Sequence, residues 1–183
     1  MTKTATARSE AGVSPPTAKN YVVFDIEATG LAPWYGDRVT CICARDSEGR
    51  AFQEVGENEL KIAHAFLEWL RMRDPRDTVL VTKNGRQFDV PFLLTRLALA
   101  GGQWREKGLF LLEYEHFDLQ DLTEKWVTLS DLARLLKCSP KSGSGLQAIR
   151  FWKKRDFLKL KSYCMQDVVT TEEVYLKWLT LGA

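Results

Sequence analysis

Apolar residues recur along this chain with two different periods, and these periods predict strands and helices. Three runs rich in β-branched and aromatic residues, the pattern of buried strands, come early, at residues 21–24, 38–45 and 51–55. The short connections between them predict an antiparallel meander. Residues 57–71 then change to helical spacing, with their apolar side chains on one side.

The rest of the chain alternates strands and helices. Residues 77–82 are apolar enough to predict a strand buried on both faces. Helices are expected at 91–100, 129–136 and 156–179, and a weaker strand at 109–112 is expected to lead to 117–119. This order predicts an α/β domain in which helices pack on a mixed β-sheet. We expect a flexible N-terminal tail over residues 1–20 and a single domain over 21–183.

Composition narrows the class of protein only slightly. The chain has 183 residues, of which 45% are hydrophobic and 27% charged, as in ordinary globular proteins. No apolar run approaches the ~20 residues that span a bilayer, so no membrane partner is expected. The first 20 residues lack the apolar segment of a secretory signal, although they leave an organellar transit peptide open. We therefore expect a protein that is not secreted.

The cysteines favour a reducing compartment, such as the cytoplasm or another compartment that contains nucleic acid. The four of them, in a chain of this length without a secretory signal, do not indicate a disulfide framework. Cys41 and Cys43 lie two residues apart in an apolar run, hence on one face of a strand. No CxxC pair or nearby histidine completes a zinc set. Buried thiols are the simplest interpretation.

Charge is distributed unevenly although the net charge is only +2. Between Lys137 and Lys161 there are eight basic residues and one acid, Asp156. Such a segment is typical of a face that binds a polyanion, and equally of a solvated helix surface.

Two acids interrupt the end of the first apolar run. Asp25 and Glu27 are two residues apart, so in a strand their side chains share one face, separated by about 6.5–7 Å. Like charges on one face repel each other and resist burial, and a divalent cation such as Mg²⁺ or Mn²⁺ would remove both costs. The alternative is a strand that has ended, with both acids in solvent.

Further acids lie on separate predicted elements. Asp89 comes where the loop after 77–82 turns into a helix, a position where an acid also stabilises the helix dipole. Tyr163 and Asp167 are four residues apart on the last helix, which places them on one face with Cβ atoms about 5–6 Å apart. A sheet and two helices can therefore direct four acids toward one point.

These residues carry a family resemblance. FDIEATGL (24–31), NGRQFD (84–89) and YCMQD (163–167) resemble the three motifs of the DEDD 3′–5′ exonucleases, which include proofreading domains of DNA polymerases and the ribonuclease D group. Tyr163 stands where another subgroup carries histidine, so the chain is similar to the tyrosine subgroup. The step from Asn84 to Asp89 resembles the exonuclease domain of family B DNA polymerases. The resemblance implies a ribonuclease-H-like fold.

The resemblance also implies a two-metal mechanism with Mg²⁺ or Mn²⁺. Asp25 would bridge both ions, and Glu27 and Asp167 would ligate the ion that binds the nucleophile. Asp89 would support the second ion, and Tyr163 would orient the attacking water.

Further positions are candidates for substrate binding. Thr29 and Leu31 fall where the family contacts the terminal nucleotide, and Phe88 could stack on a base, although core packing explains the two apolar residues equally well. Asn84 either holds the substrate or caps the helix. The basic segment offers candidate contacts to phosphates, namely Lys141, Lys153 and Lys154. For His116 we expect no role in the site, and for Asp118 a structural one.

We therefore expect a metal-dependent 3′–5′ exonuclease that releases nucleoside 5′-monophosphates from single-stranded DNA. A 3′–5′ exoribonuclease is the alternative enzyme, and a non-catalytic nucleic-acid-binding module of the same fold is the alternative of another class. A proofreading role would need a separate polymerase or repair partner.

Overall fold

A mixed five-stranded sheet forms the centre of the molecule. The computed structural model describes residues 16, 18–140, 143 and 145–181. The strand order is β3-β2-β1-β4-β5. β2 is antiparallel to both β1 and β3, whereas β4 is parallel to β1 and β5 is parallel to β4. The strands are β1 (Asn20–Ala28), β2 (Val39–Asp46), β3 (Ala51–Val55), β4 (Thr78–Thr82) and β5 (Glu115–Asp118). The expected meander of three strands and the mixed sheet are confirmed.

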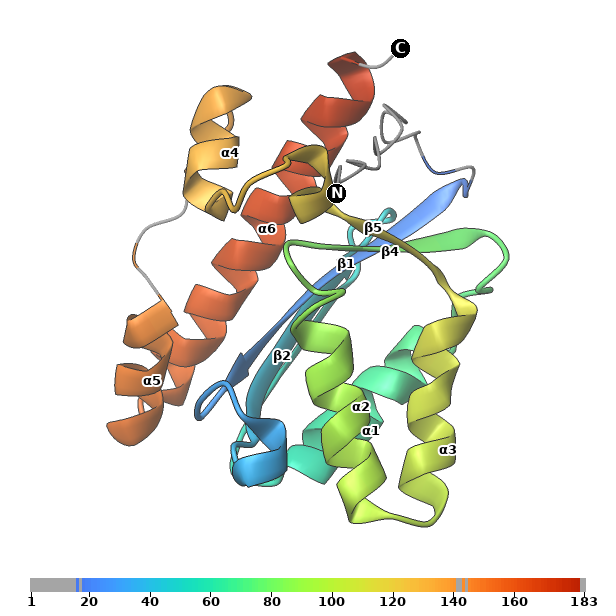
Figure 1. Cartoon of the computed structure of the whole chain (residues 1–183), viewed down its shortest axis with the longest axis vertical. Helices are drawn as coiled ribbons and strands as arrows, with labels where there is room; N and C mark the ends of the chain where they lie inside the picture. Colours follow the sequence, from blue (N-terminus) through green and yellow to red (C-terminus); the bar gives the residue numbers. More distant parts are fainter. Residues whose placement is uncertain (1–15, 17, 141–142, 144, 182–183) are drawn as a thin grey trace, which may run out of the picture.

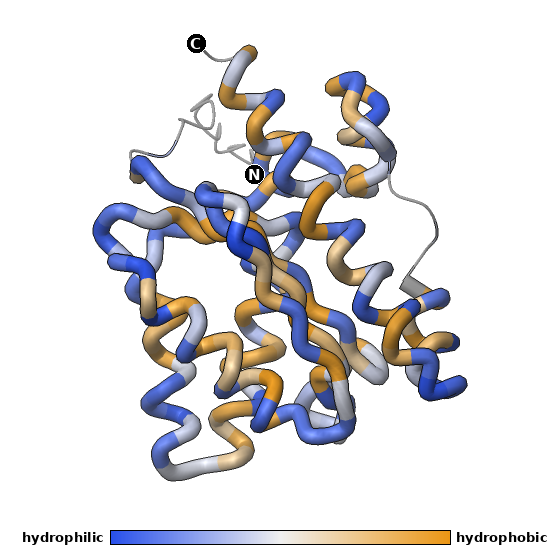
Figure 2. The backbone as a smooth tube through the Cα atoms, turned by 180° about the vertical axis from the view of Figure 1, so that it is seen from behind, coloured by the Kyte–Doolittle hydropathy of each residue, from blue (hydrophilic) through white to orange (hydrophobic). Residues whose placement is uncertain are grey.

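Helices cover both faces of the sheet (Figure 1). On one side lie α1 (Glu59–Leu70), α2 (Asp89–Ala100) and α3 (Gln103–Leu109). On the other lie α4 (Leu129–Leu135), α5 (Gly145–Lys153) and α6 (Phe157–Leu181). Hydrophobic and hydrophilic residues alternate along these helices, as expected for amphipathic helices on a sheet (Figure 2). None of the described helices is long and apolar enough to cross a bilayer.

The alternation of side chains along β1 divides the core in two. Val22, Phe24 and Ile26 pack with α1 and α2, whereas Val23 packs with α4, α5 and α6. Strand periodicity therefore assigns Asp25 and Glu27 to the side of α6. All five residues of β4 are buried, which confirms the prediction of a strand covered on both faces.

The segment at 109–112 was expected to be a strand, and this prediction is wrong. Leu109 ends α3, and a short 3₁₀ helix (Phe110–Glu113) follows it. The buried residues here are Leu111 and Tyr114, three apart, which is the period of a 3₁₀ helix. Residues 117–119, by contrast, do follow the expectation in part, because β5 begins at Glu115 and ends at Asp118.

The boundaries of the four expected helices agree with the sequence interpretation to within two residues, whereas α3 and α5 were not expected. The helix expected at 91–100 begins at Asp89, and the terminal helix expected from 156 begins at Phe157. The expected N-terminal tail, 1–20, lies largely outside the described residues, and β1 already begins at Asn20.

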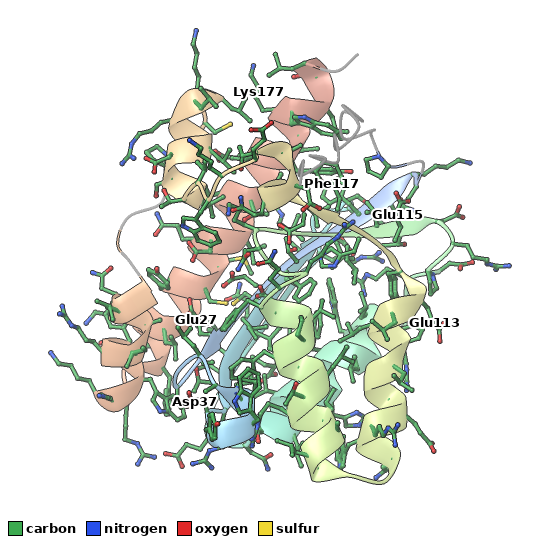
Figure 3. All side chains as sticks on the ribbon, viewed as in Figure 1. Glu27, Asp37, Glu113, Glu115, Phe117 and Lys177 are labelled. Atoms are coloured by element: carbon green, nitrogen blue, oxygen red, sulfur yellow. The ribbon has the colours of Figure 1, made fainter. Side chains whose placement is uncertain are left out.

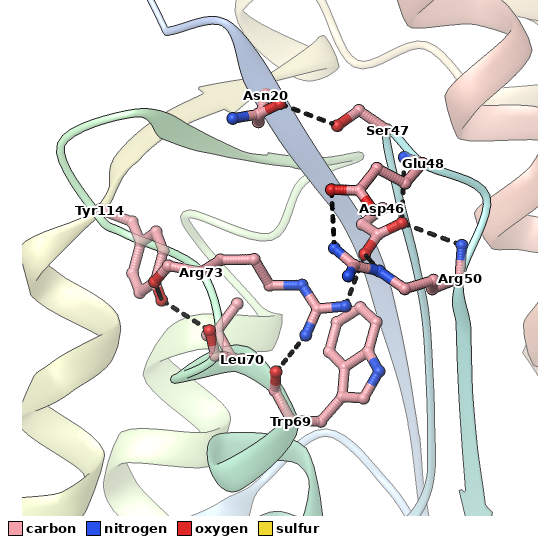
Figure 4. A network of polar contacts seen from close by, with 9 residues as sticks. All are labelled: Asn20, Asp46, Ser47, Glu48, Arg50, Trp69, Leu70, Arg73 and Tyr114. Carbon is pink, nitrogen blue, oxygen red and sulfur yellow. Dashed lines mark hydrogen bonds and ion pairs between the residues drawn. The ribbon is translucent and has the colours of Figure 1, made fainter.

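An ion-pair network connects the hairpin of β2 and β3 with the segment that follows α1, through Asp46 and Arg73 (Figure 4). Asp46 accepts hydrogen bonds from Arg73 Nη2 at 2.5 Å and from Arg50 Nε at 2.7 Å. The Arg73 guanidinium lies 3.4 Å from the centroid of the Trp69 ring. The Tyr114 hydroxyl donates to the Arg73 carbonyl oxygen at 3.0 Å. Asp46 lies opposite Val22 in the first half of β1, so the network joins this end of the sheet to the segment after α1.

Candidate active site

The second half of β1 carries the first two acids of the site. Asp25 lies opposite Cys43 of β2, and Glu27 lies opposite Cys41. Both acids are half-buried. Figure 3 shows Glu27 near the end of β1, on the side of α5 and α6. A register shift after Glu27 interrupts the regular pairing of β1 with β2. The two acids therefore lie beside an irregularity in the sheet.

Asp89 reaches β1 from the first turn of α2. The pairing of β1 with β4 extends only to Val23, and beyond it the Ile26 amide donates to Asp89 Oδ1 at 3.0 Å. The Asp89 side chain is buried. Burial raises the pKa of Asp89 to about 7, the Ile26 amide lowers it, and the carboxylates of Asp118 and Asp167 add to the rise. Asp89 therefore anchors α2 to the sheet, and its burial disfavours the ionised form of the carboxyl.

The last helix, α6, supplies the remaining two residues predicted for catalysis. Tyr163 and Asp167 lie one helical turn apart and are both buried. Together with Asp25, Glu27 and Asp89 they line one pocket of about 150 Å³. The structure therefore brings together all five residues that the sequence singled out as catalytic.

The donor set of this pocket fits a divalent cation. Carboxylate oxygens are the ligands that Mg²⁺ and Mn²⁺ prefer, and Asp25 and Glu27 each offer an oxygen to one group of ligand atoms that lie within 4.8 Å of one another. A bound cation would also offset the unfavourable charge of Asp89. In addition, the buried Oδ1 of Asn84, in the wall of the same pocket, has no hydrogen-bond partner among the described residues.

Comparisons with known proteins identify the family and the fold of this chain. A family model described as the RNase_H superfamily matches residues 22–179. The chain belongs to this family. The resemblance based on the three motifs and the ribonuclease-H-like α/β fold are thereby confirmed.

A solved structure with the same fold is the family B DNA polymerase from the hyperthermophilic archaeon Pyrobaculum calidifontis. The TM-score is 0.70 and the sequence identity 22%, over 93% of this chain and 25% of the polymerase. This RNase_H-superfamily chain thus spans about a quarter of the polymerase's length, and at this identity the likeness concerns the fold. No curated protein matched the sequence.

Two further residues of the pocket were missed at the level of sequence. Lys83, the residue after β4, and Trp126 both line the pocket. The Lys83 ammonium donates to Gln120 Oε1 at 2.6 Å and lies 4.2 Å from the centroid of the Trp126 ring. Burial lowers the pKa of Lys83, and Asp118 opposes this effect. The available signal was the position of Lys83, directly before the NGRQFD motif. The pocket therefore presents one cation beside its acids.

The loop of the second motif is held by Asp118. The carboxylate of Asp118 accepts the amide of Asn84 at 2.6 Å and that of Arg86 at 2.9 Å, which supports the structural role expected for this acid. A Cβ on Gly85 would lie 2.4 Å from Thr82 Oγ1, so only glycine fits here. Asn84 does not cap α2, because this helix begins at Asp89 with Phe88 in the capping position. The capping alternative for Asn84 is wrong.

His116 also has a structural contact. Its Nε2 lies 2.7 Å from Thr82 Oγ1, and burial lowers the pKa of His116 to about 4. The imidazole is therefore neutral at physiological pH, and it does not line the acidic pocket. This agrees with the expectation that His116 has no role in the site.

Two of the other candidates for substrate binding, Phe88 and Leu31, line a second cavity beside the acidic pocket. Phe88 lines the acidic pocket and also a neighbouring cavity of about 390 Å³, to which Leu31 contributes an exposed side chain. Leu146 and Ile149 of α5 complete that cavity, and sequence analysis had not singled them out. The neighbouring cavity is therefore largely apolar.

Thr29 lines neither of these two pockets. The Thr29 hydroxyl donates to Asp37 Oδ1 at 3.0 Å and closes the loop after β1; Figure 3 labels Asp37 there. Lys153 and Lys154 are exposed at the end of α5 and line neither pocket. Lys141 lies outside the described residues. A role for these residues in substrate binding stays a prediction.

Proposed function

We propose that this protein is a metal-dependent 3′–5′ exonuclease that hydrolyses single-stranded DNA to nucleoside 5′-monophosphates. The observation that carries the proposal is the convergence of four carboxylates and Tyr163 on one pocket, beside a larger apolar cavity. The family match supports a hydrolytic nuclease. A non-catalytic module would have no need to keep so many acids close together.

The four carboxylates would hold two divalent cations. When bound, such ions activate water and stabilise the charge that develops on the phosphate and the leaving oxygen. Tyr163 orients the attacking water from α6. Lys83, in the wall of the same pocket, attracts the phosphodiester and reduces the net negative charge that the substrate meets.

The apolar cavity receives the terminal base. Phe88 lies in the walls of both pockets, so a nucleotide whose phosphate is near the acids would have its base beside Leu31, Phe88 and Leu146. Stacking of one base on an aromatic ring contributes about 1–3 kcal/mol and is tolerant of sequence. Such a contact needs a base that is released from its pairing partner, which favours single-stranded ends.

DNA is the proposed polymer because of the resemblance of the second motif to the exonuclease domain of family B polymerases. Because the chain spans about a quarter of the polymerase, any proofreading would require a polymerase active site in addition to the residues described here.

The test uses 5′-labelled single-stranded DNA and RNA of one sequence, incubated with Mg²⁺ or Mn²⁺. We expect a ladder that shortens from the 3′ end, mononucleotide products, and arrest by phosphorothioate linkages at the 3′ terminus. Asp25→Asn should abolish the ladder. Asp121→Asn, which changes an exposed acid outside the pocket, should leave it intact.

Binding without degradation in either metal would contradict the proposal. Degradation of RNA alone would show that the substrate is RNA and not DNA. Shortening from the 5′ end would show that the direction of hydrolysis is 5′–3′.

A further inference from the structure

Three buried thiols lie directly behind the acidic pocket. Cys41 and Cys43 of β2 and Cys164 of α6 are each 0% exposed. The Sγ atoms of Cys41 and Cys43 are 3.9 Å apart, and all three Sγ atoms lie within 4.8 Å of one another. The expectation of buried thiols is confirmed for these three residues, but the sequence did not indicate that Cys164 joins the other two.

Cys164 connects the thiols to the acids. Its Sγ donates to the Asp25 carbonyl oxygen at 3.4 Å and lies 3.6 Å from Asp25 Oδ2. Ligand atoms of Asp25, Glu27 and Cys164 likewise lie within 4.8 Å of one another. Sulfur and oxygen donors therefore form one continuous set that passes from the core to the wall of the pocket.

The spacing of the sulfurs suits a tetrahedral ion. A Zn–S bond of about 2.3 Å places neighbouring sulfurs of a tetrahedral site about 3.8 Å apart. The distance between the Sγ atoms of Cys41 and Cys43 already has this value within about 0.1 Å. The third Sγ needs to move by at most about 1 Å, because it lies within 4.8 Å of the others. Thiolates select soft cations, whereas the neighbouring carboxylates select hard ones.

We propose that Cys41, Cys43 and Cys164 form a binding site for a thiophilic cation such as Zn²⁺ or Cd²⁺, with the Asp25 carboxylate as the adjacent oxygen donor. On binding, three S–H bonds break, three metal–sulfur bonds form, and three protons leave to solvent, so no oxidant is required. The cation offsets two of the three thiolate charges. Cys164 belongs both to the thiol group and to the group that it forms with Asp25 and Glu27, and the two acids line the acidic pocket.

One consequence rests on the proposed function. A soft cation that uses the Asp25 carboxylate removes an oxygen ligand from the ions of the nuclease. Zn²⁺ or Cd²⁺ should therefore inhibit DNA hydrolysis even in the presence of excess Mg²⁺.

The test is independent of activity. The reduced, metal-free full chain is titrated with Cd²⁺ in excess Mg²⁺, which occupies carboxylates and does not compete for thiolates. We expect a sulfur-to-cadmium charge-transfer band in the ultraviolet that saturates at one equivalent. Cys43→Ser should abolish this band. Cys138→Ser should preserve it, because Cys138 is the fourth cysteine and lies outside the cluster, where its Sγ contacts the Glu173 carbonyl oxygen at 3.6 Å.

Two further measurements distinguish loss of the site from misfolding of the variant. Circular dichroism shows whether Cys43→Ser folds. Cadmium NMR of the unaltered chain detects thiolate ligands directly, by a downfield shift, without any substitution. Absence of the band and of the downfield signal would overturn the proposal and leave the cysteines as small apolar core residues. The nuclease proposal would survive that result. Conversely, a chain without nuclease activity would still show the band.

Discussion

Asp89 couples folding to pH because its carboxyl is buried at the junction of α2 and β1. In the unfolded chain such a carboxyl titrates near 3.8, and in the folded protein burial raises the pKa of Asp89 to about 7. Between about pH 4 and pH 7 the unfolded chain releases this proton while the folded protein keeps it. The free energy of unfolding therefore falls as pH rises through this window, and the contribution is lost above about pH 7.

The size of the effect follows from the two pKa values of Asp89. At 1.36 kcal/mol per pKa unit, a rise from 3.8 to about 7 corresponds to at most about 4 kcal/mol of stability lost between acidic and alkaline pH. Asp89→Asn removes the charge and keeps an oxygen that can accept the Ile26 amide. For a protein of this size, ~4 kcal/mol corresponds to roughly 10 °C in Tm.

The assay is urea or thermal unfolding of metal-free protein in EDTA at pH 5 and pH 8. We expect the stability advantage of Asp89→Asn over the unaltered protein to be larger at pH 8 than at pH 5 by at most about 3 kcal/mol, because pH 5 already lies above the unfolded pKa of 3.8 and part of the ~4 kcal/mol is lost there. Asp121→Asn, an exposed acid outside the pocket, is the matched control and should show no such difference. Saturating Mg²⁺ should stabilise the unaltered protein more at pH 8 than at pH 5, because the cation binds the ionised carboxylates.

A pH-independent difference between the variant and the unaltered protein would refute this account of Asp89. A variant that is less stable at pH 8 would show that the Ile26 hydrogen bond to the charged carboxylate outweighs the cost of burial.

The remaining predictions concern binding and stability. Lys83→Met should raise KM for an oligonucleotide about tenfold and lower its salt dependence, since one cation near the phosphate is lost; an unchanged salt slope would exclude the contact. Leu31→Ala should raise KM with little change in Tm, because this side chain is 78% exposed. Reversing the charges of Lys153 and Lys154 should weaken binding and flatten its salt dependence, and unchanged binding would remove them from the interface. Arg73→Met should lower the free energy of unfolding by about 3 kcal/mol, measured in urea, because its buried carboxylate partner on β2 loses an ion pair.

Four of the five residues proposed as catalytic were predictable from the sequence because they form two pairs that each follow a local period. Asp25 and Glu27 share a strand face at a spacing of two, and Tyr163 and Asp167 share a helix face at a spacing of four. Local periodicity does not show which strand face packs against which helix face. Here the order of the three motifs along the chain, which matches the order in the family, indicated that the acids converge. Asp89 needed the same help, since one acid in a first helical turn is otherwise explained by the helix dipole.

Other features depend on contacts that no local pattern encodes. Trp126 lies outside the helices and strands and reaches the pocket only because the chain after β5 passes over Lys83. Cys164 meets Cys43 because Asp25 and Cys43 are paired across the sheet. The short apolar run at 109–112 fits a strand and a 3₁₀ helix equally well, and tertiary packing decided between them.

The placement of Tyr163 and Asp167 on α6 has a consequence for the synthesis of the protein. Ribosomes emit the chain from the N-terminus, so β1 and α2 can form while the residues of α6 are still untranslated. At that stage Asp25, Glu27 and Asp89 have no partners from the last helix, and the acidic pocket is incomplete. Any activity that depends on the complete pocket can therefore begin only after residue 167 has emerged and α6 has docked on the sheet.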